Sequence, residues 1–162
     1  MSDKADRHAA VVPARVTLVT LAVADVARAT TFYESLGWHR SSDSNESVSF
    51  FQLGGLVLSL FGVDDLAEDV GLTEALAPDA GPTGPGLGFR GFAMAINFSS
   101  TAEVDQAFDA WTSAGGVAVK RPVSVFWGGY SSYVGDLDGN LWELAYNPGW
   151  PLQSNATVQL PW

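Results

Sequence analysis

Residues 135–146 read GDLDGNLWELAY, a pattern that predicts a tight turn followed by a half-buried strand. Along this strand Trp142, Leu144 and Tyr146 share one face, while Glu143 lies on the other. A carboxylate in an otherwise apolar strand is costly unless it meets a partner, a ligand, a metal or water. Glu143 is therefore the first candidate functional residue, and the question is which of these stabilises its carboxylate.

The strand in this stretch is the last element of a pattern that occurs twice. Leu21-Ala22-Val23 corresponds to Ile96-Asn97-Phe98, and Leu58-Ser59-Leu60 corresponds to Trp142-Glu143-Leu144. Each copy predicts the order strand, helix, strand, strand, strand. The first copy has strands at 16–23, 38–40, 47–53 and 56–61 with a helix at 26–36; the second has strands at 92–98, 117–120, 130–134 and 141–146 with a helix at 101–114.

Two such copies predict an α+β fold of tandem βαβββ modules. The two sheets would lie side by side as a mixed-sheet half-barrel around a central cleft, with the helices on the outer face. The expected organisation is a loose tail at 1–13, one domain at 14–148 with modules at 16–61 and 92–147 joined by an insertion at 62–91, and a C-terminal tail at 149–162. The Gly- and Pro-rich insertion is either a surface loop or a lid over the cleft.

Composition excludes several classes of protein and partner. The 162 residues include 18 acidic and 8 basic side chains, a net charge of −10, which argues against nucleic acid and anionic membranes as partners. The absence of cysteine excludes disulfides, thiolate catalysis and Cys-bound zinc. No stretch has the length of a signal peptide core or a membrane span, so a cytoplasmic protein is expected.

Two sets of residues carry a resemblance to a known family. Phe32-Tyr33 is followed by Leu36-Gly37-Trp38, and Asp136-x-Asp138-Gly139-Asn140-x-Trp142-Glu143 closes the second module. Together they resemble the vicinal oxygen chelate superfamily, which includes glyoxalase I, bleomycin resistance proteins and extradiol dioxygenases. The resemblance covers residues 16–148 and implies the fold, but this fold hosts several unrelated chemistries.

The resemblance also implies where a metal would be held. Enzymes of the superfamily usually bind one divalent ion through His or Glu on the first and last strand of each module. The corresponding positions here are Leu18, Ser59, Ala93 (or Phe92, if the register shifts by one) and Glu143. One carboxylate does not make a metal site. His8 and His39 lie elsewhere, and Asp136 and Asp138 fit a hairpin turn better than a calcium loop. We therefore expect neither a metal nor another cofactor.

Strand alternation and the aromatic segment at 125–133 predict what lines the cleft. A few polar groups would converge among small side chains and aromatic rings, as in sites for small molecules. The predicted ligand-binding residues are Thr20, Gln52, Ser59, Asn97, Phe126, Trp127, Tyr130, Tyr133 and Glu143. Phe126, Trp127 and Tyr130 are equally compatible with core or dimer contacts.

Three functions are compatible with these residues. The first is binding of a small aromatic or cationic compound, with Glu143 as counter-charge, which resembles the antibiotic-binding branch of the superfamily. The second is a metal-free lyase or isomerase in which Glu143 is the catalytic general base. The third is a metal-dependent glyoxalase or dioxygenase, which needs ligands from a partner chain. Aromatic residues in the C-terminal tail, Trp150 and Trp162, favour a homodimer.

Overall fold

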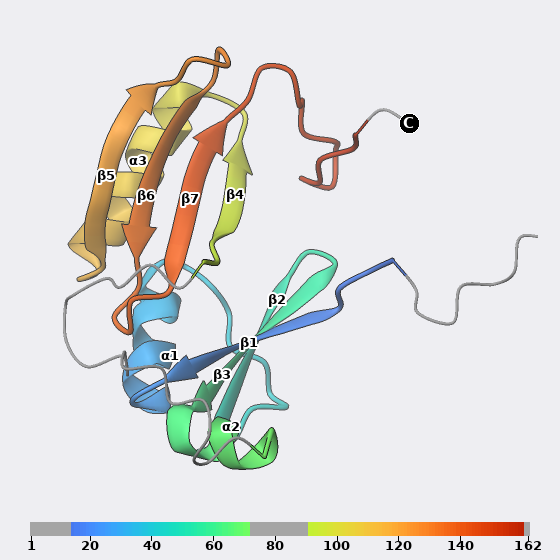
Figure 1. Cartoon of the computed structure of the whole chain (residues 1–162), viewed down its shortest axis with the longest axis vertical. Coiled ribbons are helices and arrows are strands. Elements are labelled where there is room, and N and C mark those ends of the chain that lie inside the picture. Colours follow the sequence, from blue (N-terminus) through green and yellow to red (C-terminus); the bar gives the residue numbers. More distant parts are fainter. Residues whose placement is uncertain (1–13, 72–90, 161–162) are drawn as a thin grey trace, which may run out of the picture.

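The computed structural model describes residues 14–71 and 91–160, which form two separate sheets with helices packed against them (Figure 1). The first module consists of β1 (Leu18–Val23), α1 (Val26–Ser35), β2 (Val48–Leu53) and β3 (Leu56–Gly62). Its sheet has the order β1-β3-β2, with β1 parallel to β3 and β2 antiparallel to it. A short helix, α2 (Val63–Asp69), follows β3 directly.

The second module repeats this order. It consists of β4 (Met94–Phe98), α3 (Thr101–Ser113), β5 (Val117–Ser124), β6 (Tyr130–Gly135) and β7 (Leu141–Tyr146), arranged as β4-β7-β6-β5 with β4 parallel to β7. Thr20 pairs with Ser59 in the first sheet, just as Ala95 pairs with Glu143 in the second. The α+β fold of two mixed sheets built from repeated modules is therefore confirmed.

Local signals explain where the helices begin and end. The Asp25 carboxylate accepts a 2.9 Å hydrogen bond from the Arg28 N–H and caps α1. At α3 the Ser100 hydroxyl accepts from the Glu103 N–H at 3.2 Å, and the Glu103 carboxylate accepts from the Ser99 N–H at 2.8 Å. Gly37 and Gly115 follow the two helices with φ of +88° and +99°, a conformation that glycine adopts without steric cost.

The predicted strand at 38–40 is wrong. Only an isolated bridge between Arg40 and Phe51 forms there, so the first sheet has three strands in the described part of the chain. The reason is that Trp38 turns inward and stacks on Tyr33, with ring centroids 5.0 Å apart and planes inclined by 21°. Burial of a large aromatic surface outweighs the few backbone hydrogen bonds that a short fourth strand would add.

The remaining boundaries differ less. β5 extends to Ser124, beyond the predicted 117–120, because it is an edge strand whose register shifts accommodate Pro122. The predicted insertion at 62–91 begins with α2, and its residues 72–90 lie outside the described residues, as do the N-terminal tail at 1–13 and Trp162. Among the described helices, none is long and apolar enough to span a membrane.

The two modules share one hydrophobic core. Helix α1 buries Phe32 and Tyr33, and α3 buries Val104, Phe108 and Trp111 against the second sheet. The turn after β6 links the modules directly, because the Tyr33 hydroxyl donates to Asp136 Oδ2 at 2.7 Å. A second link runs from the Ala24 N–H to Asp138 Oδ1 at 2.8 Å. The turn between β6 and β7, which contains Asp136 and Asp138, therefore fixes how the modules pack.

Candidate functional site

A hollow of about 470 Å³ lies on the face of the second sheet opposite α3, the face toward the viewer in Figure 1. Two strands, β4 and β7, the turn after β5 and the chain after β7 contribute to it. Its lining residues are Ala95, Asn97, Trp127, Glu143, Ala145, Asn147 and Trp150. This hollow, called here the Glu143 hollow, has the volume of a small-molecule site.

Strand alternation places Glu143 in this hollow. Trp142 and Leu144 on the same strand are buried against α3, so the side chain between them points away from the helix. Small residues on both sides, Ala95 and Ala145, leave space above the strands. Within the lining of the hollow Glu143 is the one charged side chain, and no basic residue lines it.

The two tryptophans that form the walls come from loops. Trp127 lies in the turn between β5 and β6, which is closed by 3.0 Å hydrogen bonds between the backbones of Val125 and Gly128 and of Val125 and Gly129. The Trp127 ring covers Gly129, where a Cβ atom would overlap it. Trp150 is brought back by a turn in which its N–H donates to the Asn147 carbonyl at 3.1 Å. Both rings remain partly exposed, at 43% and 44%.

A row of polar side chains runs across the sheet beside the hollow. Tyr133 on β6 lies directly opposite Glu143 on β7. Burial, followed by the charge of the Glu143 carboxylate and a hydrogen bond to it, raises the pKa of the Tyr133 phenol. The Lys120 ammonium lies 6.0 Å from the centroid of the Tyr133 ring on its other side. Tyr133 therefore pairs with Glu143 on one neighbouring strand and with Lys120 on the other.

The structure brings together only some of the predicted site residues. Asn97, Trp127 and Glu143 line the hollow, and Tyr133 lies beside it. Tyr130 does not line the hollow, because its hydroxyl donates to Asp105 Oδ1 on α3 at 2.9 Å, and a ligand-binding role for it stays a prediction. Alternation along β6 puts Tyr130 and Tyr133 on opposite faces of the sheet, because Tyr133 follows Tyr130 by three positions, an odd number. Phe126 projects fully into solvent.

The predicted residues of the first sheet lie elsewhere. Thr20, Gln52 and Ser59 do not belong to the lining of the Glu143 hollow. The Gln52 amide donates to the carbonyls of Gly54 and Leu56 at 2.6 and 3.1 Å, within its own hairpin. Ser59 is buried in the middle strand of the first sheet, between Thr20 and Phe50. A ligand-binding role for these three residues stays a prediction.

Two lining residues were missed by the sequence analysis. Asn147 and Trp150 belong to a segment that was expected to be partly tail, but it returns over the sheet. The turn is stabilised by the Asn147 side chain, whose Oδ1 accepts from the Gly149 N–H at 2.9 Å. The signal was present as Asn147-Pro148-Gly149, a sequence typical of turns, directly after the last strand.

The residues at the positions implied for a metal do not fit one. Leu18 and Ala93 have no donor atoms, Ser59 offers a neutral hydroxyl, and only Glu143 is a carboxylate. Across residues 14–71 and 91–160, no group of three or more His, Cys, Asp or Glu side chains is arranged to hold an ion. His39 is exposed and does not line this hollow.

Comparisons with known proteins agree with this architecture. A family model described as Glyoxalase/Bleomycin resistance protein/Dioxygenase superfamily matches residues 15–144. A glyoxalase-related enzyme from Fulvimarina pelagi is 30% identical, with a TM-score of 0.76 over 91% of this chain and 99% of that one. No curated protein matches the chain.

Two further solved structures share the fold at lower identity. A glyoxalase/bleomycin resistance protein/dioxygenase from Nocardioides is 24% identical, with a TM-score of 0.66 over 94% of this chain and 93% of that one. A lactoylglutathione lyase from Agrobacterium tumefaciens is 23% identical, with a TM-score of 0.59 over 85% of this chain and 97% of that one.

Proposed function

Because the chain belongs to the Glyoxalase/Bleomycin resistance protein/Dioxygenase superfamily, we propose that it binds a small aromatic cation in the Glu143 hollow. The observation that carries this proposal is the composition of the lining: one carboxylate, two tryptophans and no basic side chain. A cation gains from the carboxylate and from the faces of aromatic rings, whereas an anion would be repelled by both.

The other lining residues support a planar ligand of modest size. Ala95 and Ala145 contribute only methyl groups to the lining, and the amides of Asn97 and Asn147 offer both donors and acceptors. The net charge of −10 raises the local concentration of cations around the whole molecule. Local complementarity and the overall field therefore favour the same class of ligand.

The ligand class is tested by calorimetry with benzyltrimethylammonium, an aromatic cation that carries no other functional group. The wild-type chain should bind it at one site. Glu143→Gln should weaken binding about tenfold, because one charge contact is lost while the shape is kept. Trp127→Ala should also weaken it, through loss of one aromatic wall.

The matched control is Glu34→Gln on the exposed side of α1, which changes the net charge by the same amount far from the hollow. It should leave affinity within about twofold, as expected for a distant site. The proposal is wrong if Glu143→Gln and Glu34→Gln have equal effects, since the overall field alone would then explain binding. Lack of saturable binding by the wild-type chain would also contradict it.

A further inference from the structure

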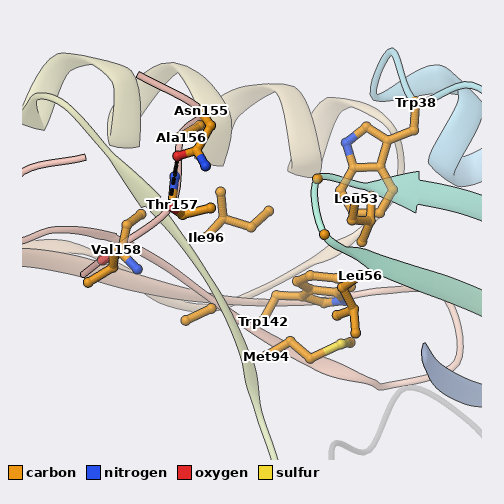
Figure 2. A pocket seen from close by; sticks show the side chains of 14 residues that line it. Trp38, Leu53, Leu56, Met94, Ile96, Trp142, Asn155, Ala156, Thr157 and Val158 are labelled. Carbon is orange, nitrogen blue, oxygen red and sulfur yellow. Dashed lines mark hydrogen bonds between the residues drawn. The ribbon is translucent and has the colours of Figure 1, made fainter. Parts of the chain in front are cut away.

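A second hollow, of about 490 Å³, lies next to the first, between the edge strand β4, the hairpin that joins β2 to β3, and the C-terminal segment at 155–158 (Figure 2). We call it the β4-edge hollow. Its apolar lining includes Trp38, Leu53, Leu56, Met94, Ile96 and Trp142. Both modules and the C-terminal segment thus contribute to one cavity.

The β4-edge hollow differs from the Glu143 hollow in chemistry. None of its lining residues carries a charge, although the chain as a whole has a net charge of −10. At one end the rings of Trp38 and Trp142 meet edge to face, with centroids 5.6 Å apart and planes inclined by 72°. Asn155 and Thr157 lie toward the other end (Figure 2). The hollow is therefore apolar along its length and polar at one end.

The two hollows meet at strand β4. Met94 and Ile96 pair with Trp142 and Leu144 on the α3 face of the sheet, whereas Glu143 points to the other face. Only Ala95 and Asn97 belong to the lining of both. A change at Glu143 therefore leaves the walls of the β4-edge hollow intact, and the two sites can be tested separately.

The C-terminal wall of this hollow is a built feature of the chain. The Gln153 N–H donates to the Thr157 carbonyl at 2.9 Å, and the Ala156 N–H donates to the Gln153 carbonyl at 2.8 Å. Ala156 has a φ of +60°, a left-handed conformation that side chains other than glycine seldom adopt. This wall lies beyond residue 144, where the match to the family model ends.

We propose that the β4-edge hollow is a second ligand site, which takes a neutral, elongated molecule with an apolar body and a hydrogen-bonding end. The volume lies within the range of small-molecule sites. An ionised ligand would lose hydration there without meeting a counter-charge. Aromatic and aliphatic side chains offer the body dispersion contacts, and Asn155 and Thr157 offer the polar end donors and acceptors.

Two fluorescent probes with the same ring system test this site. N-phenyl-1-naphthylamine is neutral, and 8-anilinonaphthalene-1-sulfonate carries one added sulfonate. The wild-type chain should bind the neutral probe saturably at one site and about tenfold more tightly than the anion, because the hollow has no basic group. Equal or tighter binding of the anion would overturn the proposal.

Matched variants locate the bound probe. Val158→Glu puts a carboxylate in the C-terminal wall, whereas Leu160→Glu makes the same change at an exposed position that does not line the hollow. Val158→Glu should weaken binding of the neutral probe about tenfold, and Leu160→Glu should leave it within about twofold. Equal effects of the two variants would overturn the proposal.

Two further variants show which of the two hollows the neutral probe occupies. Gly55→Leu adds a side chain in the hairpin turn, where a Cβ would meet no atom within 4 Å, and should weaken the neutral probe by occupying its space. Glu143→Gln should leave the neutral probe unaffected. If Glu143→Gln abolishes its binding instead, the probe occupies the first hollow and this inference fails, while the proposed function stands.

Discussion

At the scale of single residues, Asp136 decides how the two modules are joined. Its side chain is 1% exposed and accepts four hydrogen bonds, from the Tyr33 hydroxyl, the Asn140 amide and the backbone N–H groups of Asp138 and Asn140. A buried carboxylate is tolerated only when its oxygens are satisfied in this way. The Tyr33 hydroxyl also accepts from Trp142 Nε1 at 3.2 Å, so one residue of α1 serves two elements of the second module.

Removing the Tyr33 hydroxyl should therefore cost stability. Tyr33→Phe leaves Asp136 and Trp142 each without one buried partner and should lower the free energy of unfolding by about 1–3 kcal/mol. Urea denaturation followed by circular dichroism measures this change. Tyr146→Phe, at a half-buried tyrosine of β7, is the control and should change stability by less than about 0.5 kcal/mol. Equal effects would show that the hydroxyl of Tyr33 contributes nothing specific.

At the scale of elements, each helix depends on short-range signals that act before the modules meet. α3 begins with a reciprocal pair in which the Ser100 hydroxyl caps the Glu103 N–H and the Glu103 carboxylate returns to Ser99. Its buried face, formed by Val104, Phe108 and Trp111, is the one that helical spacing predicts. Both features were readable from the sequence, because they depend on residues within one or two turns.

Loss of the cap should weaken α3 without altering the core. Ser100→Ala should lower the free energy of unfolding by about 1 kcal/mol, since the first turn loses an acceptor for its N–H groups. Ser113→Ala, an exposed position at the other end of the same helix, should change it by less than about 0.5 kcal/mol. Thermal and urea unfolding of the two variants give the comparison. A larger loss for Ser113→Ala would contradict the capping interpretation.

At the scale of the whole molecule, one core spans both modules, and a buried tyrosine in it makes the stability of the fold depend on pH. Burial, followed by the charge of Asp136 and the hydrogen bond to it, raises the pKa of Tyr33 well above its ordinary value of 10.0. In the unfolded chain this tyrosine ionises near pH 10, whereas in the folded chain it stays neutral to higher pH. Above pH 10 the unfolded state therefore binds fewer protons, and stability falls as pH rises.

Alkaline unfolding should reveal this coupling. The free energy of unfolding should decrease above pH 10, with Tyr33 contributing a slope of up to about 1.4 kcal/mol per pH unit. Tyr33→Phe should make the decline shallower but not abolish it, because the pKa values of Tyr130 and Tyr133 are also raised. Urea titrations between pH 8 and 11, with wild type and variant side by side, measure both slopes. Parallel slopes would contradict the assignment to Tyr33.

The packing of one module on the other limits how much of the site could be predicted from the sequence. Alternation along β7 predicted correctly that Glu143 points away from the core, and alternation along β4 placed Asn97 on the same side. It could not show that Thr20, Gln52 and Ser59 line neither hollow, because that depends on how the second module packs on the first. Tyr130 differs from Tyr133 for a local reason, because alternation along β6 turns the two rings to opposite faces of the sheet.

The sequence by itself determined the order of the elements, their buried faces and the duplicated fold, because period, capping and turn signals act between near neighbours. Only the tertiary structure decided which polar side chains meet. The bond from Tyr33 to Asp136 joins residues 103 positions apart, and it sets the packing of the modules. Likewise, Trp150 lines the same hollow as Glu143, and Val158 the same hollow as Trp142, only because the segment after β7 folds back past β4. Such contacts arise from the sum of many burial energies across the core, which no local pattern records.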